Sequence, residues 1–87
     1  MLQLTLYGTL GCHLCEEAEA LLAEALHRQV QSIDLVSVDI ADHDEWMARY
    51  GMRIPVLRHA SSGLELDWPF GEADLESFLA SAARYTH

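Results

Sequence analysis

Cys12 and Cys15, the only two cysteines of the chain, stand two residues apart between an apolar run and a helical pattern. The run before them covers residues 2–7. Two thiols at this spacing, behind a strand and at a helix N-terminus, close a tight disulfide or present a thiolate of low pKa. One such pair closes only a small loop and constrains the unfolded chain little, so it is poorly explained as a structural staple. Redox chemistry or metal binding explains it better.

The apolar pattern around this pair predicts a strand, a long helix and a second strand. Residues 2–7 are typical of a buried strand, and residues 33–40 form a second run rich in β-branched side chains. Between them, Gly8 and Gly11 are expected to loosen the backbone before the helix begins. The apolar face predicted for this helix consists of Leu14, Ala18, Leu21, Leu22, Ala25 and Leu26. Strand, helix and strand in this order predict a βαβ unit with parallel strands.

A second, shorter helix is predicted after residue 42. Asp42 is expected to cap its N-terminus, because Glu45 follows three residues later as in a capping box. Gly51 suits its end. Its apolar side is expected to consist of Trp46, Met47 and Tyr50.

The rest of the chain predicts a hairpin and a last helix. Residues 54–58 and 64–68 alternate as two strands around a turn at 60–63. The apolar face of the last helix consists of Leu75, Phe78, Leu79 and Ala82. The order βαβαββα predicts an α/β fold in which a four-stranded mixed sheet is flanked by three helices, with residues 1–87 forming a single domain.

Composition narrows the class of protein. About half of the 87 residues are hydrophobic, yet no apolar run approaches the length of a membrane span, and no signal peptide is recognisable. We therefore expect a soluble protein of the cytoplasm. The net charge is −9 and the chain has no lysine, so binding to nucleic acid or to an anionic membrane is not expected. A neutral or basic protein partner suits this charge better.

Together these features resemble the thioredoxin-like superfamily and, within it, the small glutaredoxin-like proteins. Three features carry the resemblance: Cys12-x-x-Cys15 between a strand and a helix, the segment 50–57 around Ile54-Pro55, and the terminal strand-strand-helix unit. They span nearly the whole chain. The resemblance implies a thioredoxin fold and thiol-disulfide chemistry.

The resemblance also suggests how the two thiols divide the work. Cys12 is expected to be the nucleophile, because the free amides of the first helical turn stabilise a thiolate there. Cys15, one turn further in, would resolve the mixed disulfide. A cationic His13 would lower the pKa of the Cys12 thiol, whereas Glu16 and Glu17 would raise it. An exposed His13 that does not act on the thiol is the alternative.

Substrate-binding residues follow from the same resemblance. Pro55 matches the cis-proline that faces the cysteines in this family, and Ile54 before it would offer backbone hydrogen bonds to an extended substrate. Arg53 would meet a substrate carboxylate. Asp74 is a candidate for the aspartate that holds glutathione. However, residues 7–11 lack the family's basic residue, and only one of its paired glycines remains, at Gly71.

Two aromatic residues, Trp68 and Phe70, precede the last helix. They form a partner surface in one interpretation and close the core beneath a loop in the other.

We expect a monomeric thiol-disulfide oxidoreductase that acts on a protein disulfide or a small thiol substrate. It needs no bound cofactor, and its reductant is glutathione or a thioredoxin reductase system. The alternative is a non-catalytic module of the same fold that docks a protein or holds a metal or iron-sulfur centre through its cysteines. No metal site is predicted, because a second ligand pair is missing and the other histidines are scattered along the chain.

Overall fold

A four-stranded mixed sheet lies at the centre of the computed structural model, which describes residues 2–85. The strands of these residues are β1 (Leu2–Gly8), β2 (Ile33–Asp39), β3 (Val56–His59) and β4 (Glu65–Asp67). In space they follow the order β2-β1-β3-β4. β1 pairs in parallel with β2 and antiparallel with β3, and β3 pairs antiparallel with β4. The predicted mixed sheet is confirmed.

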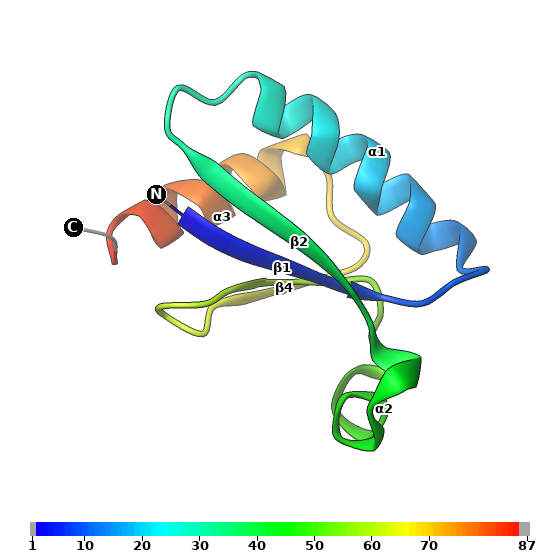
Figure 1. Ribbon diagram of the computed structural model, residues 1–87. Coiled ribbons are helices and arrows are strands. Elements are labelled where there is room, and N and C mark those ends of the chain that lie inside the picture. Colours follow the sequence, from blue (N-terminus) through cyan, green and yellow to red (C-terminus); the bar gives the residue numbers. More distant parts are fainter. Residues whose placement is uncertain (1, 86–87) are drawn as a thin grey trace.

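The three α-helices of the described residues cover both faces of this sheet. They are α1 (His13–His27), α2 (Asp44–Tyr50) and α3 (Glu72–Ala83), and a short 3-10 turn, η1 (Ile40–Asp42), precedes α2. α1 and α3 lie together over one face, and α2 lies below the other (Figure 1). The α/β fold class and the order βαβαββα are as predicted. None of the helices within residues 2–85 is long and apolar enough to cross a membrane.

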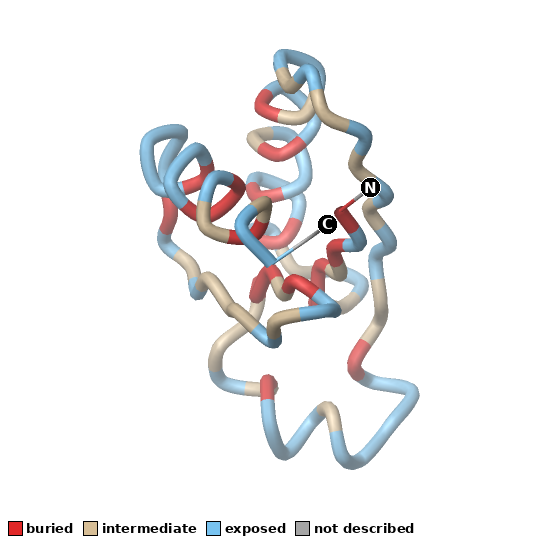
Figure 2. The backbone as a smooth tube through the Cα atoms, turned by 90° about the vertical axis from the view of Figure 1, so that its left-hand side faces the viewer, coloured by how far each residue is buried: buried red, intermediate tan, exposed pale blue. Residues whose placement is uncertain are grey.

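Alternation along β1 divides the interior into two clusters. Leu2, Leu4 and Leu6 point toward α1 and α3 and form the main core with the apolar stripes of those helices. Tyr7 points the other way, into a smaller cluster under α2 that includes Tyr50. Buried positions recur along the inner side of α1 and along β1 in Figure 2. β1 therefore contributes side chains to both sides of the sheet.

The buried stripe of α1 begins one residue later than predicted. Leu14 is 44% exposed, and the buried residues of the helix are Cys15, Ala18, Leu22 and Ala25. β1 ends at Gly8, and Cys15 already lies against that glycine. Leu14 therefore has no strand beneath it, and its place in the predicted apolar face is wrong.

The start of α2 also differs from the prediction. Asp42 belongs to η1, and the N-cap of α2 is His43, whose side chain makes no capping hydrogen bond. The aspartate that acts as an N-cap is Asp39, at the start of η1, since its Oδ1 accepts the backbone N–H of Ala41 at 2.9 Å. The helix ends at Tyr50, and Gly51 follows it as the C-cap, as predicted.

The apolar side of α2 is narrower than predicted. Tyr50 is buried and Trp46 is half-buried, but Met47 is 48% exposed. A helix of seven residues makes only about two turns, so it presents one narrow stripe to the sheet.

Two leucines of α1 test which side of the helix supports the fold. Leu22→Ala should lower the free energy of unfolding by about 2–5 kcal/mol, because a fully buried side chain leaves a cavity in the main core. Leu14→Ala, the matched control, should change it by about 0.5 kcal/mol or less. Urea unfolding of both variants measures the difference. Equal losses would contradict the observed orientation of α1.

Candidate functional site

The two cysteines lie at the N-terminus of α1 and are joined as a disulfide. Cys12 is the N-cap residue, with an extended backbone, and Cys15 lies in the first turn. The Sγ atom of Cys12 accepts a hydrogen bond from the backbone N–H of Cys15 at 3.1 Å. The backbone carbonyl of Cys12 accepts one from the N–H of Glu16 at 3.2 Å. The sulfur thus takes the place of a capping oxygen, at the end of the helix where the backbone dipoles favour negative charge.

The two cysteines differ in burial. Cys12 is half-buried, whereas Cys15 is only 5% exposed. Behind Cys15 lies Gly8, the last residue of β1, and a Cβ atom at that position would stand 2.9 Å from the Cys15 sulfur. Gly8 therefore provides space, while Gly11, with a φ of 76°, provides the backbone freedom that the sequence suggested. Cys12 is therefore the more accessible of the two cysteines.

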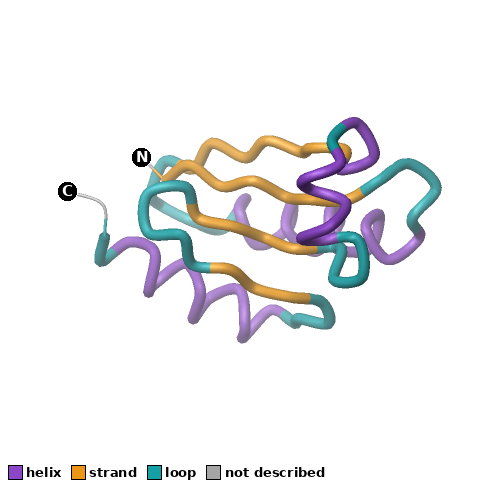
Figure 3. Tube along the Cα trace, turned by 90° about the horizontal axis from the view of Figure 1, so that it is seen from below, coloured by secondary structure: helices purple, strands orange, loops and turns teal. Residues whose placement is uncertain are grey.

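Sheet pairing brings the segment around Pro55 to the same end of the sheet. Tyr7 pairs with Val56, the first residue of β3, so Pro55 lies at the same end of the sheet as Gly8, the last residue of β1. The Ile54–Pro55 peptide bond is cis, as is the Trp68–Pro69 bond. Pro55 is buried, and its carbonyl accepts the backbone N–H of Trp68 at 3.2 Å. The loop before α1 and the loop before β3 both lie at this end in Figure 3.

Ile54 can offer a substrate only half of the hydrogen bonds that we expected. Its N–H donates to the carbonyl of Tyr50 at 3.0 Å and is thus already paired within the chain. Within residues 2–85 its carbonyl has no hydrogen-bond donor. Binding of an extended substrate at Ile54 stays a prediction, with the carbonyl as its acceptor.

Arg53 is paired with two carboxylates of β4. Its Nε and Nη2 atoms donate to the two oxygens of Asp67 at 3.1 and 2.7 Å, and Nη2 also donates to Glu65 at 2.7 Å. A substrate carboxylate at this guanidinium would have to compete with these partners, and its binding by Arg53 stays a prediction. In the structure, Arg53 links the loop before Pro55 to β4.

Glu65 is the centre of this charged network. Its side chain is 18% exposed, accepts the Tyr50 hydroxyl at 2.8 Å, and has Arg49 and Arg58 each at 3.7 Å. Burial alone would raise the pKa of Glu65, but hydrogen bonds from Arg53 and Tyr50 outweigh it and lower the pKa below its ordinary 4.5.

The partners of Glu65 have shifted pKa values as well. A hydrogen bond from Arg53 lowers the pKa of Asp67 below its ordinary 3.8. Burial, together with the bond to Glu65, raises the pKa of Tyr50 to about 12. The Tyr50 hydroxyl therefore remains a donor at neutral pH.

His13 turns toward the acidic side chains that follow it. Its ring nitrogens lie 3.7 Å from Glu16 and 3.9 Å from Glu17, and its side chain is 82% exposed. Pairs this exposed contribute little to stability. The two glutamates would offset a positive charge on the ring. An effect of His13 on the pKa of the Cys12 thiol therefore stays a prediction.

The remaining predicted residues lie around α3. Asp74 is exposed, and its Oδ2 accepts the backbone N–H of Gly71 at 2.8 Å, so it caps the helix; glutathione binding there stays a prediction. Phe70 is 5% exposed in the main core, which excludes it as a partner surface and favours the alternative of a closed core. Trp68 is half-buried against the same core and packs edge-on against Phe70. A docking role for Trp68 stays a prediction.

Within residues 2–85, no group of three or more histidine, cysteine, aspartate and glutamate side chains comes together that could hold a metal ion. His59 is buried at the end of β3, where burial lowers its pKa and its Nδ1 atom lies 2.7 Å from Ser62 Oγ. His87 lies outside the described residues.

Sequence reasoning missed the use of Gly8 and the network around Glu65. The signal for Gly8 was present, because a glycine at the end of a strand often marks a close approach. The signal for the network was the alternation of Glu65 and Asp67, which places both carboxylates on one face of β4, together with two arginines, Arg49 and Arg53, shortly before Pro55.

Comparisons with known proteins agree with this fold. The family model of the glutaredoxin-like domain (DUF836) matches residues 3–80. The X-ray structure of the Northeast Structural Genomics target protein XcR50 from X. campestris is 41% identical, and the match covers 90% of this chain and 96% of that chain with a TM-score of 0.76. The solution NMR structure of protein Ne2328 from Nitrosomonas europaea is 27% identical, with coverage of 88% and 89% and a TM-score of 0.74. No curated protein matches the chain.

The lowered pKa values of Glu65 and Asp67 predict an acid-dependent loss of stability. Both groups bind fewer protons in the folded chain, so their stabilisation is complete above about pH 4.5 and is lost as the pH falls through their folded-state values. Glu65→Gln should therefore reduce the drop in melting temperature between pH 7 and pH 3.5. Glu76→Gln, an exposed carboxylate on α3, is the matched control. An unchanged drop in the Glu65 variant would contradict the assignment.

Proposed function

The chain belongs to the glutaredoxin-like domain family, and on this premise we propose that it is a thiol-disulfide oxidoreductase whose Cys12 and Cys15 cycle between dithiol and disulfide. One observation carries the proposal: the half-buried Cys12 sulfur accepts the N–H of Cys15 at the N-terminus of α1, with the buried Cys15 sulfur bonded to it. This arrangement suits a nucleophile with a resolving thiol behind it.

In the first step the Cys12 thiolate attacks one sulfur of the substrate disulfide. A Cys12–substrate disulfide forms, the substrate bond breaks, and the leaving thiolate takes a proton from water. The N–H of Cys15 donates to the Cys12 sulfur and so favours its charged form before the attack. Because Cys12 is the half-buried sulfur of the pair, it is the one that the substrate reaches.

In the second step Cys15 loses its proton to water and attacks the Cys12 sulfur. The mixed disulfide breaks, the second substrate thiolate leaves and is protonated, and the Cys12–Cys15 disulfide forms. Two electrons have then passed to the substrate. Packing of the Cys15 sulfur on Gly8 keeps this thiol away from the incoming substrate, so it reacts only within the chain.

A cellular reductant completes the cycle by returning two electrons and two protons to the disulfide. Two glutathione molecules, or a thioredoxin reductase system, are the reductants in this proposal. The proposed location is the cytoplasm, where disulfides are mostly transient and catalytic.

Arg53, the cation nearest to Pro55 in sequence, is already paired with Asp67 and Glu65, and this favours a protein disulfide over the anionic glutathione disulfide as the substrate.

Serine variants of the two cysteines separate the two steps. Cys12→Ser should reduce a peptide disulfide no faster than buffer does, because the attacking sulfur is gone. Cys15→Ser should still attack and should accumulate a covalent peptide adduct, detected as the added peptide mass in intact-protein mass spectrometry. Regeneration of the oxidised parent protein by glutathione and by an NADPH-coupled thioredoxin reductase identifies the reductant. No adduct and no turnover with either reductant would favour the non-catalytic binding module.

The pKa of the Cys12 thiol tests the electrostatic part of the proposal. It should lie below the ordinary value of about 8.5, because the helix N-terminus favours the thiolate. His13→Ala should raise it by about 0.5 unit, a small effect because the ring is exposed and shared with two glutamates. His27→Ala, at the other end of α1, is the control and should leave it unchanged. Thiolate absorbance at 240 nm during a pH titration gives each value, and an equal result for both variants would rule out coupling of His13 to Cys12.

A further inference from the structure

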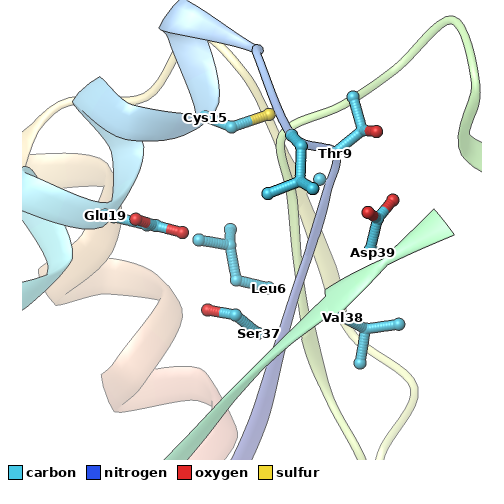
Figure 4. A pocket seen from close by; sticks show the side chains of 9 residues that line it. Leu6, Thr9, Cys15, Glu19, Ser37, Val38 and Asp39 are labelled. Carbon is cyan, nitrogen blue, oxygen red and sulfur yellow. The ribbon is translucent and has the colours of Figure 1, made fainter. Parts of the chain in front are cut away.

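A cavity of about 240 Å³ opens beside the buried cysteine, between α1 and the carboxyl ends of β1 and β2 (Figure 4). It lies on the β2 side of the disulfide, whereas the Pro55 segment lies on the β3 side. The lining residues that matter here are Leu6, Leu10, Cys15, Glu19, Ser37 and Asp39. Leu10 belongs to the loop that leads to Cys12, so the cavity adjoins the place where a mixed disulfide forms.

Two carboxylates reach this cavity from facing elements. Glu19 extends from α1 toward the sheet, and Asp39 stands at the end of β2 (Figure 4). Within residues 2–85 Glu19 has no ion pair or side-chain hydrogen bond, and one oxygen of Asp39 remains available beside the one that caps η1. No arginine or histidine of the described residues lines the cavity.

The walls between these carboxylates are largely apolar. Leu6 is part of the main core, and Leu10, at the rim, is 89% exposed. An aliphatic chain with a positive charge at its end matches this arrangement, because its methylene groups pack on the leucines while its head group reaches the carboxylates. An anionic group such as a glutathione carboxylate would meet two negative charges and no donor cation.

We propose that this cavity receives a lysine or arginine side chain of a protein substrate, adjacent in that substrate to the cysteine that Cys12 attacks. The proposal rests on the proposed function and deepens it, since it names the class of protein disulfide that is preferred. The net charge of −9 and the absence of lysine from the chain act in the same direction, because they draw basic substrates toward the protein.

A series of peptide disulfides tests the preference. The peptides differ only in the residue next to the cysteine, which is arginine, glutamine or glutamate. The parent protein should show a kcat/KM about fivefold higher for the arginine peptide than for the glutamine peptide, and lower still for the glutamate peptide. Raising the ionic strength to 1 M should reduce the preference, because salt screens exposed charges.

Variants of the cavity distinguish local recognition from attraction by net charge. Glu19→Gln and Asp39→Asn should each reduce the ratio of arginine to glutamine rates by about twofold or more, and Asn retains the oxygen that caps η1. Glu24→Gln, the matched control on the same helix, should retain the ratio, because Glu24 does not line the cavity. Thermal unfolding of each variant at pH 7 shows whether the fold is retained.

The outcomes separate this inference from the function on which it rests. Equal kcat/KM for the three peptides, or the same loss of preference in the Glu24 and Glu19 variants, would overturn the cavity proposal and leave the oxidoreductase intact. If none of the peptides is reduced, the oxidoreductase proposal itself fails.

Discussion

The contact between the Cys15 sulfur and the backbone of Gly8 is the constraint on which the site depends. A side chain at Gly8 would collide with that sulfur, so the glycine allows α1 to lie close against the end of β1. The buried stripe from Cys15 to Ala25 then sets the position of the whole helix over the sheet. β1 pairs with β3, and this pairing brings the Pro55 segment to the same end of the sheet as the cysteines.

The two faces of the sheet achieve their stability differently. Under α1 and α3 the core is aliphatic, and it depends on buried area and close packing. Under α2 the helix has only seven residues, too few to be stable alone, and the interior is aromatic. There Tyr50 stacks on Tyr7 with ring centroids 4.2 Å apart and donates to Glu65, while Arg53 joins the loop after α2 to β4. Because Ile54 and Pro55 follow directly, this polar network helps to set the position of the predicted substrate-binding loop.

The sequence predicts those parts of this arrangement that depend on periodicity. The strands, the main helices, the mixed sheet and the cysteine pair at a helix N-terminus follow from apolar spacing and from the family resemblance. Leu14 and Met47 do not, because periodicity identifies one face of a helix but not where the sheet beneath it ends. The partners of Arg53 depend on which residues of β4 lie opposite it, and strand register is a property of the folded chain. For Phe70 both interpretations were open, and packing decided in favour of the core.

The strand order has a consequence for how copies of this chain meet one another. β2 is an outer strand of seven residues, so within residues 2–85 one row of its backbone N–H and C=O groups has no neighbouring strand. Val36 is exposed on it, and such an edge is open to pairing with an identical edge and hence to aggregation. Asp34 and Asp39 flank that valine, and a second copy would bring the same charges against them. Repulsion between like edges, added to the overall negative charge, opposes the pairing of two copies along this strand.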